Sequence, residues 1–232
     1  MAANMTKEML YQELRRRIIT MDLPPGADLD EAELSAAYGM SRTPVRETLI
    51  RLQSDGLVVQ RRNRGASVAP LDMGTLQSWF EAGRMVHRAV VRLACLRRRD
   101  EDLAAIRAAM EEFEQVMAAE DLLGMIHANE RFHDCIGLAA RNPYLYASYQ
   151  RILADHERIS RLCYGHEIEY EEEADKQLTL QQHRDLYAAI AERDADTAER
   201  VIDAHLNLCK DGLRRILEGS EHVLADVALD EA

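Results

Sequence analysis

The sequence predicts a mainly α-helical protein, with a short N-terminal part of mixed helix and strand and a longer, wholly helical C-terminal part. Three observations predict this class. Hydrophobic residues make up 47% of the 232 residues but aromatic residues only 5%, and the helix formers Ala, Leu, Arg and Glu dominate. Glycine and proline are scarce after residue 75. Apolar residues recur at helical spacings along most of the chain. A chain of this length can bury a substantial core in one large or two small domains.

Three helices are expected in the first 55 residues. In the first of them, Leu10, Leu14 and Ile18 recur every four residues and form one apolar face. The run Leu-Pro-Pro-Gly at 23–26 breaks that pattern, and Gly39 ends the second helix. The expected helices cover residues 6–21, 30–38 and 42–54.

A β-hairpin is expected directly after the third helix. Gly56 ends that helix, and two short β-runs, 57–59 and 66–68, flank the polar, arginine-rich segment 60–65. Three helices followed by a hairpin within about 65 residues predict a winged helix-turn-helix, in which the hairpin is the wing.

Six long helices are expected after Pro70. They cover residues 73–98, 101–118, 121–139, 143–163, 177–192 and 195–217. Long helices with short connections are typical of an all-α antiparallel bundle, here of six or seven helices, and a break in the first helix near Gly83 stays open. The expected domains are therefore 1–71 and 72–218, with 219–232 as a flexible acidic tail.

The charge is distributed unevenly. The whole chain carries a net charge of −12, but the segment 39–66 holds six arginines and two acidic residues, a net charge of +4. A locally basic patch on an otherwise acidic protein suits a small, defined DNA footprint and excludes indiscriminate coating of nucleic acid.

The sequence predicts neither a membrane protein nor a secreted one. It has no run of 18 uncharged apolar residues, so we expect no membrane span. The charged N-terminus has no apolar signal core, which predicts a cytoplasmic protein. The cysteines are widely spaced and form no Cys-x-x-Cys pair, which is typical of reduced, buried core thiols. They are Cys95, Cys135, Cys163 and Cys209.

The third helix carries the residues expected to read DNA. The second helix of a helix-turn-helix pair lies in the major groove with its first residues at the base edges. Those positions hold Ser41, Arg42, Thr43 and Arg46, with Arg51 further along. An arginine fork can bond O6 and N7 of guanine together. The hydroxyls of Ser41 and Thr43 can donate to phosphates or bases, and both residues are candidate N-caps. A narrow groove attracts the wing arginines at 61, 62 and 64.

A specific motif lies over these helices. Its core is Ser-Arg-Thr-Pro-Val-Arg-Glu at 41–47, inside the longer run 34–49. The segments 51–58 and 64–68 continue it into the hairpin. Together they resemble the signature of GntR-family regulators, which implies a winged helix-turn-helix that binds double-stranded operator DNA.

The resemblance assigns roles to individual residues. It implies that Arg42, Thr43 and Arg46 contact DNA, and that the wing from Arg62 through Arg64 to Gly65 enters the minor groove. Helix-turn-helix proteins commonly read two half-sites with two-fold symmetry, so we expect a homodimer.

Three histidines lie on apolar stripes of three different bundle helices. They are His133, His183 and His205, and Asn129 precedes His133 by one helical turn. A single histidine on such a stripe is usually a satisfied core residue. Three neutral imidazoles that converge inside one bundle are natural ligands for Zn²⁺ or a similar cation.

The helical part resembles the FadR-type, all-helical effector domain called FCD, so that the two resemblances cover residues 8–217. Many members have an Asp-x-x-Phe-His motif and two later helices with one histidine each. The resemblance implies that Asn129, His133, His183 and His205 bind a divalent metal, zinc or nickel, whose coordination a small organic acid completes. Asn129 stands where aspartate is common, and Glu130 is a possible substitute.

The first bundle helix departs from a second family pattern, Arg-x-x-Leu-Glu. This chain has Arg84, His87 and Arg88 at its first, fourth and fifth positions. By resemblance, Arg84 could bind an effector carboxylate, since an arginine fork matches one well. His87 and Arg88 are further effector-binding candidates, because added positive charge would suit a di-acid or a phosphorylated ligand.

Three functions compete at this point. The favoured one is a metabolite-responsive repressor that a small organic acid releases from its operator. A metal-dependent hydrolase using the three histidines is less favoured, because there is no His-Glu-x-x-His motif and no supported general base. An architectural DNA-binding protein with a purely structural bundle is distinguished by operator affinity that no metabolite or chelator changes.

Overall fold

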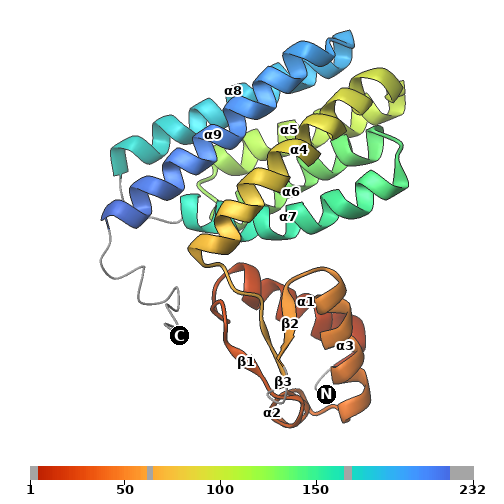
Figure 1. Ribbon diagram of the computed structural model, residues 1–232, viewed down its shortest axis with the longest axis vertical. Helices are drawn as coiled ribbons and strands as arrows, with labels where there is room; N and C mark the ends of the chain where they lie inside the picture. Colours follow the sequence, from red (N-terminus) through yellow and green to blue (C-terminus); the bar gives the residue numbers. More distant parts are fainter. Residues whose placement is uncertain (1–4, 62–64, 165–168, 220–232) are drawn as a thin grey trace. The chain divides into compact units, whose positions relative to one another are not determined.

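The computed structural model describes residues 5–61, 65–164 and 169–219 (Figure 1). The chain divides into two compact units, the first up to residue 75 and the second from residue 76 to the end of the described part. The predicted wing residues Arg62 and Arg64 and the predicted acidic tail lie outside the described residues, apart from Gly219 at the end of the last helix.

The first unit contains three helices and a small antiparallel sheet. Its elements are α1 (Lys7–Ile19), β1 (Asp28–Leu29), α2 (Glu31–Tyr38), α3 (Arg42–Ser54), β2 (Val58–Arg61) and β3 (Gly65–Val68). The strand order is β1-β3-β2. The predicted hairpin is β2 and β3, paired with Val58 opposite Val68. The strand β1, which the sequence reasoning missed, adds to the other edge of β3. Only its Leu29 is buried, so two residues show no alternation from which to predict it.

Local signals in the sequence set the boundaries of these helices. The hydroxyl of Thr6 accepts a hydrogen bond from the backbone N–H of Met9 and caps α1. The carboxylate of Asp30 accepts from two backbone N–H groups and caps α2. Gly39 ends α2 in the left-handed conformation, with φ of 63°, which a glycine adopts without steric cost.

The second unit consists of six helices among the described residues. They are α4 (Met73–Arg97), α5 (Asp100–Ala118), α6 (Leu122–Ala139), α7 (Pro143–Tyr164), α8 (Glu169–Glu192) and α9 (Ala195–Gly219). Neighbours in sequence run antiparallel along the bundle (Figure 1). All six contribute to one core, which includes Val90, Ile106, Phe132, Tyr149, Ile190 and Ile202. The predicted antiparallel bundle is therefore confirmed, with six helices in the part of the chain that the structure describes.

Two boundary questions are decided by the structure. The helix α4 continues through Gly83, where an added Cβ would lie in ordinary van der Waals contact with Ile152 and Trp79, so this glycine does not break the helix. The predicted start of α8 at residue 177 is wrong, because the helix begins at Glu169. The residues 169–175 are mostly acidic, and the sequence predicted a loop there. Glu and Ala are good helix formers, and acidic residues are favourable near a helix N-terminus.

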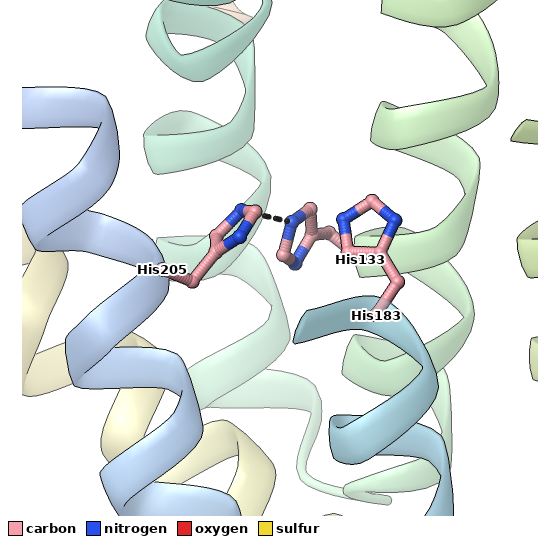
Figure 2. Close-up of side chains that lie close together, drawn as sticks. All are labelled: His133, His183 and His205. Atoms are coloured by element: carbon pink, nitrogen blue, oxygen red, sulfur yellow. Dashed lines mark hydrogen bonds between the residues drawn. The ribbon is translucent and has the colours of Figure 1, made fainter. Parts of the chain in front are cut away.

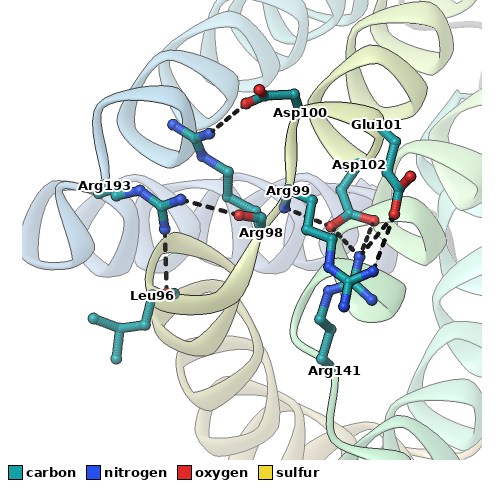
Figure 3. A network of polar contacts seen from close by, with 8 residues as sticks. All are labelled: Leu96, Arg98, Arg99, Asp100, Glu101, Asp102, Arg141 and Arg193. Carbon is teal, nitrogen blue, oxygen red and sulfur yellow. Dashed lines mark hydrogen bonds and ion pairs between the residues drawn. The ribbon is translucent and has the colours of Figure 1, made fainter.

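Hydrogen bonds and ion pairs of charged side chains connect the helix ends where α4, α5 and the α8–α9 turn meet (Figure 3). Arg193, in that turn, donates to the backbone carbonyls of Cys95, Leu96 and Arg98 at 2.9, 3.2 and 3.1 Å. The last carbonyls of a helix have no partner within the helix, so Arg193 satisfies groups that end α4. Arg141, just after α6, pairs with the carboxylate of Asp102 in α5 at 2.8 Å.

We expect Arg193→Ala to lower the free energy of unfolding by about 1–2 kcal/mol, because each lost bond joins a charged donor to a helix-end carbonyl at a partly hydrated site. Urea denaturation followed by circular dichroism measures the loss. Arg200→Ala is the matched control, since Arg200 is an exposed arginine on α9 that bonds Thr197, and it should stay within about 0.5 kcal/mol of the parent. Equal values for the two variants would contradict the capping role.

The four cysteines are free thiols. Cys95 is buried as expected, but the expectation of burial is wrong for Cys135, Cys163 and Cys209, which are half-buried. Within the part of the chain that the structure describes, none of the helices is long and apolar enough to cross a membrane.

Candidate DNA-binding surface and metal centre

The start of α3 presents three of the predicted DNA-binding residues to solvent. Ser41 is the N-cap, with extended backbone angles, and its side chain makes no capping hydrogen bond. Of the two candidate caps, Ser41 is therefore the one at the N-cap position, and Thr43 lies in the first turn of the helix. The side chains of Ser41, Arg42 and Thr43 are all exposed. This end of α3 is thus free to meet a ligand with the residues that a recognition helix uses.

Arg46, one turn further along α3, is held by an acidic residue of α2. Its Nε and Nη2 donate to the two carboxylate oxygens of Glu31 at 2.9 and 2.7 Å. The hydrogen bonds to Glu31 raise the pKa of Arg46 and lower the pKa of the carboxyl group. The pair is exposed, so its net contribution to stability is small. The planar guanidinium that donates to Glu31 can donate to two acceptors of a guanine edge once the carboxylate is displaced.

The remaining predicted DNA-binding residues are placed differently. Arg51 bonds Glu8 at 2.6 Å and lies 3.5 Å from the centre of the Tyr11 ring, so it joins α3 to α1. This packing gives no support to a DNA contact by Arg51. Gly65 is exposed at the start of β3 with φ of 79°, a conformation that favours glycine.

The predicted histidines converge within the bundle. His133 of α6, His183 of α8 and His205 of α9 each offer a ring nitrogen, and these three atoms lie within 4.8 Å of one another (Figure 2). All three side chains are buried. The helices that carry them are far apart in sequence, so only the packing of the bundle brings the rings together.

One distance inside this cluster matches the ligand spacing of a metal centre. The Nε2 atoms of His133 and His205 are 3.3 Å apart. Two nitrogens bound to one zinc ion at the tetrahedral angle would be about 3.3 Å apart, given zinc–nitrogen distances near 2.0–2.1 Å. Neither ring nitrogen of His183 has a hydrogen-bond partner among the described residues, and neither does Oδ1 of the buried Asn129. Buried polar atoms without partners are rare, and a bound ion would supply the missing partner.

The electrostatic environment keeps these imidazoles neutral. Burial lowers the pKa of His205 to about 4, and burial together with the neighbouring histidines lowers the pKa of His133 and His183 well below 6.5. A metal ion binds neutral imidazole, so the rings are in the required form at neutral pH. The donor set therefore fits a divalent cation.

Two further histidines lie beside the cluster. His87, predicted to contact an effector, is fully buried on α4, and its Nδ1 is 3.3 Å from the hydroxyl of Tyr149. His156 on α7 is buried, with its ring centre 5.0 Å from that of His133 and stacked on Trp79. Sequence reasoning missed His156 because charged residues flank it on both sides. The apolar Ile152 and Ile159, at helical spacing on its own face, were the signal that could have found it.

The predicted effector arginines of α4 lie on the exposed side of that helix. Nη2 of Arg84 donates to Oδ1 of Asn207 at 2.5 Å. Nη2 of Arg88 bonds the carboxylate of Glu199 at 2.7 Å. About half of each arginine side chain is exposed, so both reach across to α9 along the surface. This placement gives no support to a direct contact with an effector inside the bundle.

Comparison with protein families gives two matches that follow one another along the chain. The model for bacterial regulatory proteins of the gntR family matches residues 6–68, and the model for the FCD domain matches residues 78–208. The chain belongs to the GntR family of regulators with an FCD domain. Its first unit is the helix-turn-helix that binds DNA, and its second is the effector domain.

Curated relatives of this GntR regulator cover most of its length. The HTH-type transcriptional repressor RspR of Escherichia coli K12 is 24% identical over 209 residues, which are 90% of this chain and 89% of the relative. The galactonate operon transcriptional repressor of the same organism is 29% identical over 231 residues, 88% and 94% of the two chains. The Nta operon transcriptional regulator of Aminobacter aminovorans is 27% identical over 199 residues, 84% and 89% of the two chains.

Solved structures show the same fold. E. coli McbR/YncC superposes on this regulator with a TM-score of 0.73 at 20% identity, over 94% of this chain and 99% of the other. A GntR regulator from Rhodococcus sp. RHA1 gives a TM-score of 0.70 at 22% identity, over 93% and 99% of the two chains. The relatives are transcriptional regulators and not enzymes, so the hydrolase alternative is set aside.

Proposed function

We propose that this GntR regulator is a repressor that binds operator DNA as a homodimer and is released by a small carboxylate bound at a divalent metal centre. The proposed metal ligands are Asn129, His133, His183 and His205. The observation that carries the proposal is the convergence of the three buried imidazoles, whose ring nitrogens lie within 4.8 Å of one another, with unpartnered atoms on His183 and Asn129. We propose zinc or nickel, because imidazole-rich sites accept both and availability often decides between them.

The charge of the centre supports an anionic effector. All four proposed ligands are neutral side chains, so the protein contributes no negative charge to offset a divalent cation. When bound, the ion would act as a Lewis acid that attracts a carboxylate oxygen. Neither Arg84 nor Arg88 is needed for that attraction, and both are already bonded to α9.

The relatives support repression. RspR and the galactonate regulator are named as repressors, and galactonate is a carboxylate. For the DNA contacts we propose Ser41, Arg42, Thr43 and Arg46 in the major groove, with the wing at Arg62, Arg64 and Gly65 in the minor groove. The effector can release DNA only if it binds two arrangements of the dimer with different affinity.

The test measures operator binding by the purified protein in the presence of zinc or nickel, with the operator first selected from random-sequence DNA. Candidate carboxylates, sugar acids among them, are then added one at a time. We expect one of them to weaken operator binding only when the metal is present. An operator affinity that responds to neither carboxylates nor chelator would instead identify an architectural DNA-binding protein.

We expect Asn129→Asp to raise metal affinity, because a carboxylate replaces a neutral amide oxygen next to a divalent cation. The same added charge should weaken binding of the anionic effector. Competition against a chromophoric chelator measures the metal affinity. Asn207→Asp, an exposed change from amide to carboxylate on α9, is the matched control. Equal affinities for all three proteins would remove Asn129 from the ligand set and leave Glu130, half-buried on the same helix, as the alternative.

A further inference from the structure

Two of the three clustered imidazoles have side-chain partners on the nitrogen that faces away from the cluster. The Nδ1 atom of His205 lies 3.1 Å from Oε1 of Gln182. An amide oxygen only accepts hydrogen bonds, so this contact places the proton of His205 on Nδ1. The lone pair of the ring is then on Nε2, the atom 3.3 Å from Nε2 of His133.

His133 has a partner of the same kind, the hydroxyl of Tyr149. Its Nδ1 lies 3.5 Å from the hydroxyl of Tyr149, and that hydroxyl lies 3.3 Å from Nδ1 of His87. When the hydroxyl donates to His87, it can accept from Nδ1 of His133. This arrangement leaves the lone pair of His133 on Nε2 as well. The side chains of His133, Tyr149 and His87 are all buried, so the surrounding packing holds them in this arrangement.

The geometry of α8 explains how Gln182 reaches its partner. Consecutive residues of an α-helix point about 100° apart. His183 faces α6, where its ring stacks on Phe132 with 4.3 Å between ring centres. Gln182, the residue before it, bonds His205 of α9 and is itself 8% exposed. One turn of α8 therefore provides one clustered histidine and orients another.

We propose that Gln182 is a positioning residue for the metal centre, which fixes the tautomer and the ring orientation of His205 so that Nε2 meets the ion. Tyr149, backed by His87, does the same for His133. This proposal rests on the proposed function, since it concerns the same centre. It gives the buried His87 a role at the centre that is distinct from effector binding. Partners of this kind on metal-binding histidines typically change metal affinity 10- to 100-fold when they are removed.

The test compares Gln182→Leu and Gln182→Glu in the full-length protein, with Gln181→Leu as the matched control. Gln181 is the exposed neighbour, bonded to Asp185. Zinc affinity is measured by competition against a chromophoric chelator. We expect Gln182→Leu to bind about 10- to 100-fold more weakly, and Gln182→Glu to bind at least as tightly as the parent, because a carboxylate accepts from Nδ1 more strongly. Gln181→Leu should match the parent.

A second measurement does not depend on the metal. Nitrogen-15 NMR of the metal-free protein reports which ring nitrogen of His205 carries the proton. We expect the proton on Nδ1 in the parent and in Gln182→Glu, and a mixture of tautomers in Gln182→Leu. Equal zinc affinities and an unchanged His205 tautomer across the variants would overturn the positioning role and leave the metal centre intact.

Two other results also overturn the proposal. Equal losses of affinity in Gln182→Leu and Gln182→Glu, with both metal-free forms melting below the parent, would assign Gln182 to packing alone. A parent protein that binds neither zinc nor nickel would overturn the metal centre itself, and the positioning role with it.

Discussion

The triple variant His133→Ala, His183→Ala, His205→Ala is expected to lose metal binding completely. The reason is that the variant lacks three of the four proposed ligands. The parent should hold about one zinc or nickel ion per chain. Zinc at 100 times its dissociation constant should stabilise the parent by about 2.7 kcal/mol and leave the variant unchanged. Metal analysis of dialysed protein and thermal unfolding with and without zinc measure the two effects.

Controls separate loss of the metal from loss of the fold. His127 is an exposed histidine on α6, and His127→Ala should bind metal as the parent does. The single variant His205→Gln removes one imidazole and keeps a polar side chain of similar length, so it tests the centre if the triple variant does not fold. A parent protein without metal after reconstitution with zinc or nickel would reduce the histidines to core residues.

Replacement of Arg46 by alanine is expected to weaken operator binding by about 1–3 kcal/mol, or roughly 5- to 150-fold. The reason is the loss of a planar fork that can bond two atoms of a guanine edge. Binding to non-specific DNA should change much less, since most of that affinity comes from phosphate contacts. Fluorescence anisotropy at a fixed salt concentration, with operator and scrambled duplexes, measures both losses.

Arg92→Ala is the matched control for this variant. Arg92 is a half-exposed arginine on α4, paired with Glu199 at 2.7 Å, just as Arg46 is paired with Glu31. Arg92 also pairs with Asp196 at 3.1 Å, so each change removes one exposed arginine together with its surface ion pairs, but only Arg46 lies on the predicted recognition helix. An equal, small loss for operator and scrambled DNA would show that Arg46 contacts phosphate or solvent only.

The elements that the sequence predicted well are those with strong local signals. Helix α3 was placed at its exact boundaries, because a motif with a proline at its start and a glycine after its end frames a clear apolar face. The apolar stripes of the bundle predicted five of its six helices to within two residues. The start of α8 and the two-residue strand β1 lack such signals. An acidic stretch fits a loop or a helix, and a short strand depends on the edge that β3 offers.

The sequence alone determined the family, the helical class and the three histidines, because each rests on residue types at local spacings. Tertiary structure alone decided which side chains meet. It placed His87 inside the bundle and Arg84 and Arg88 on its surface, although all three lie within five positions of one helix. Which residues of a helix face inward is fixed by the helices packed against it, as the pairing of these arginines with α9 shows. The contact between Gln182 and His205 likewise exists only because α8 and α9 lie side by side.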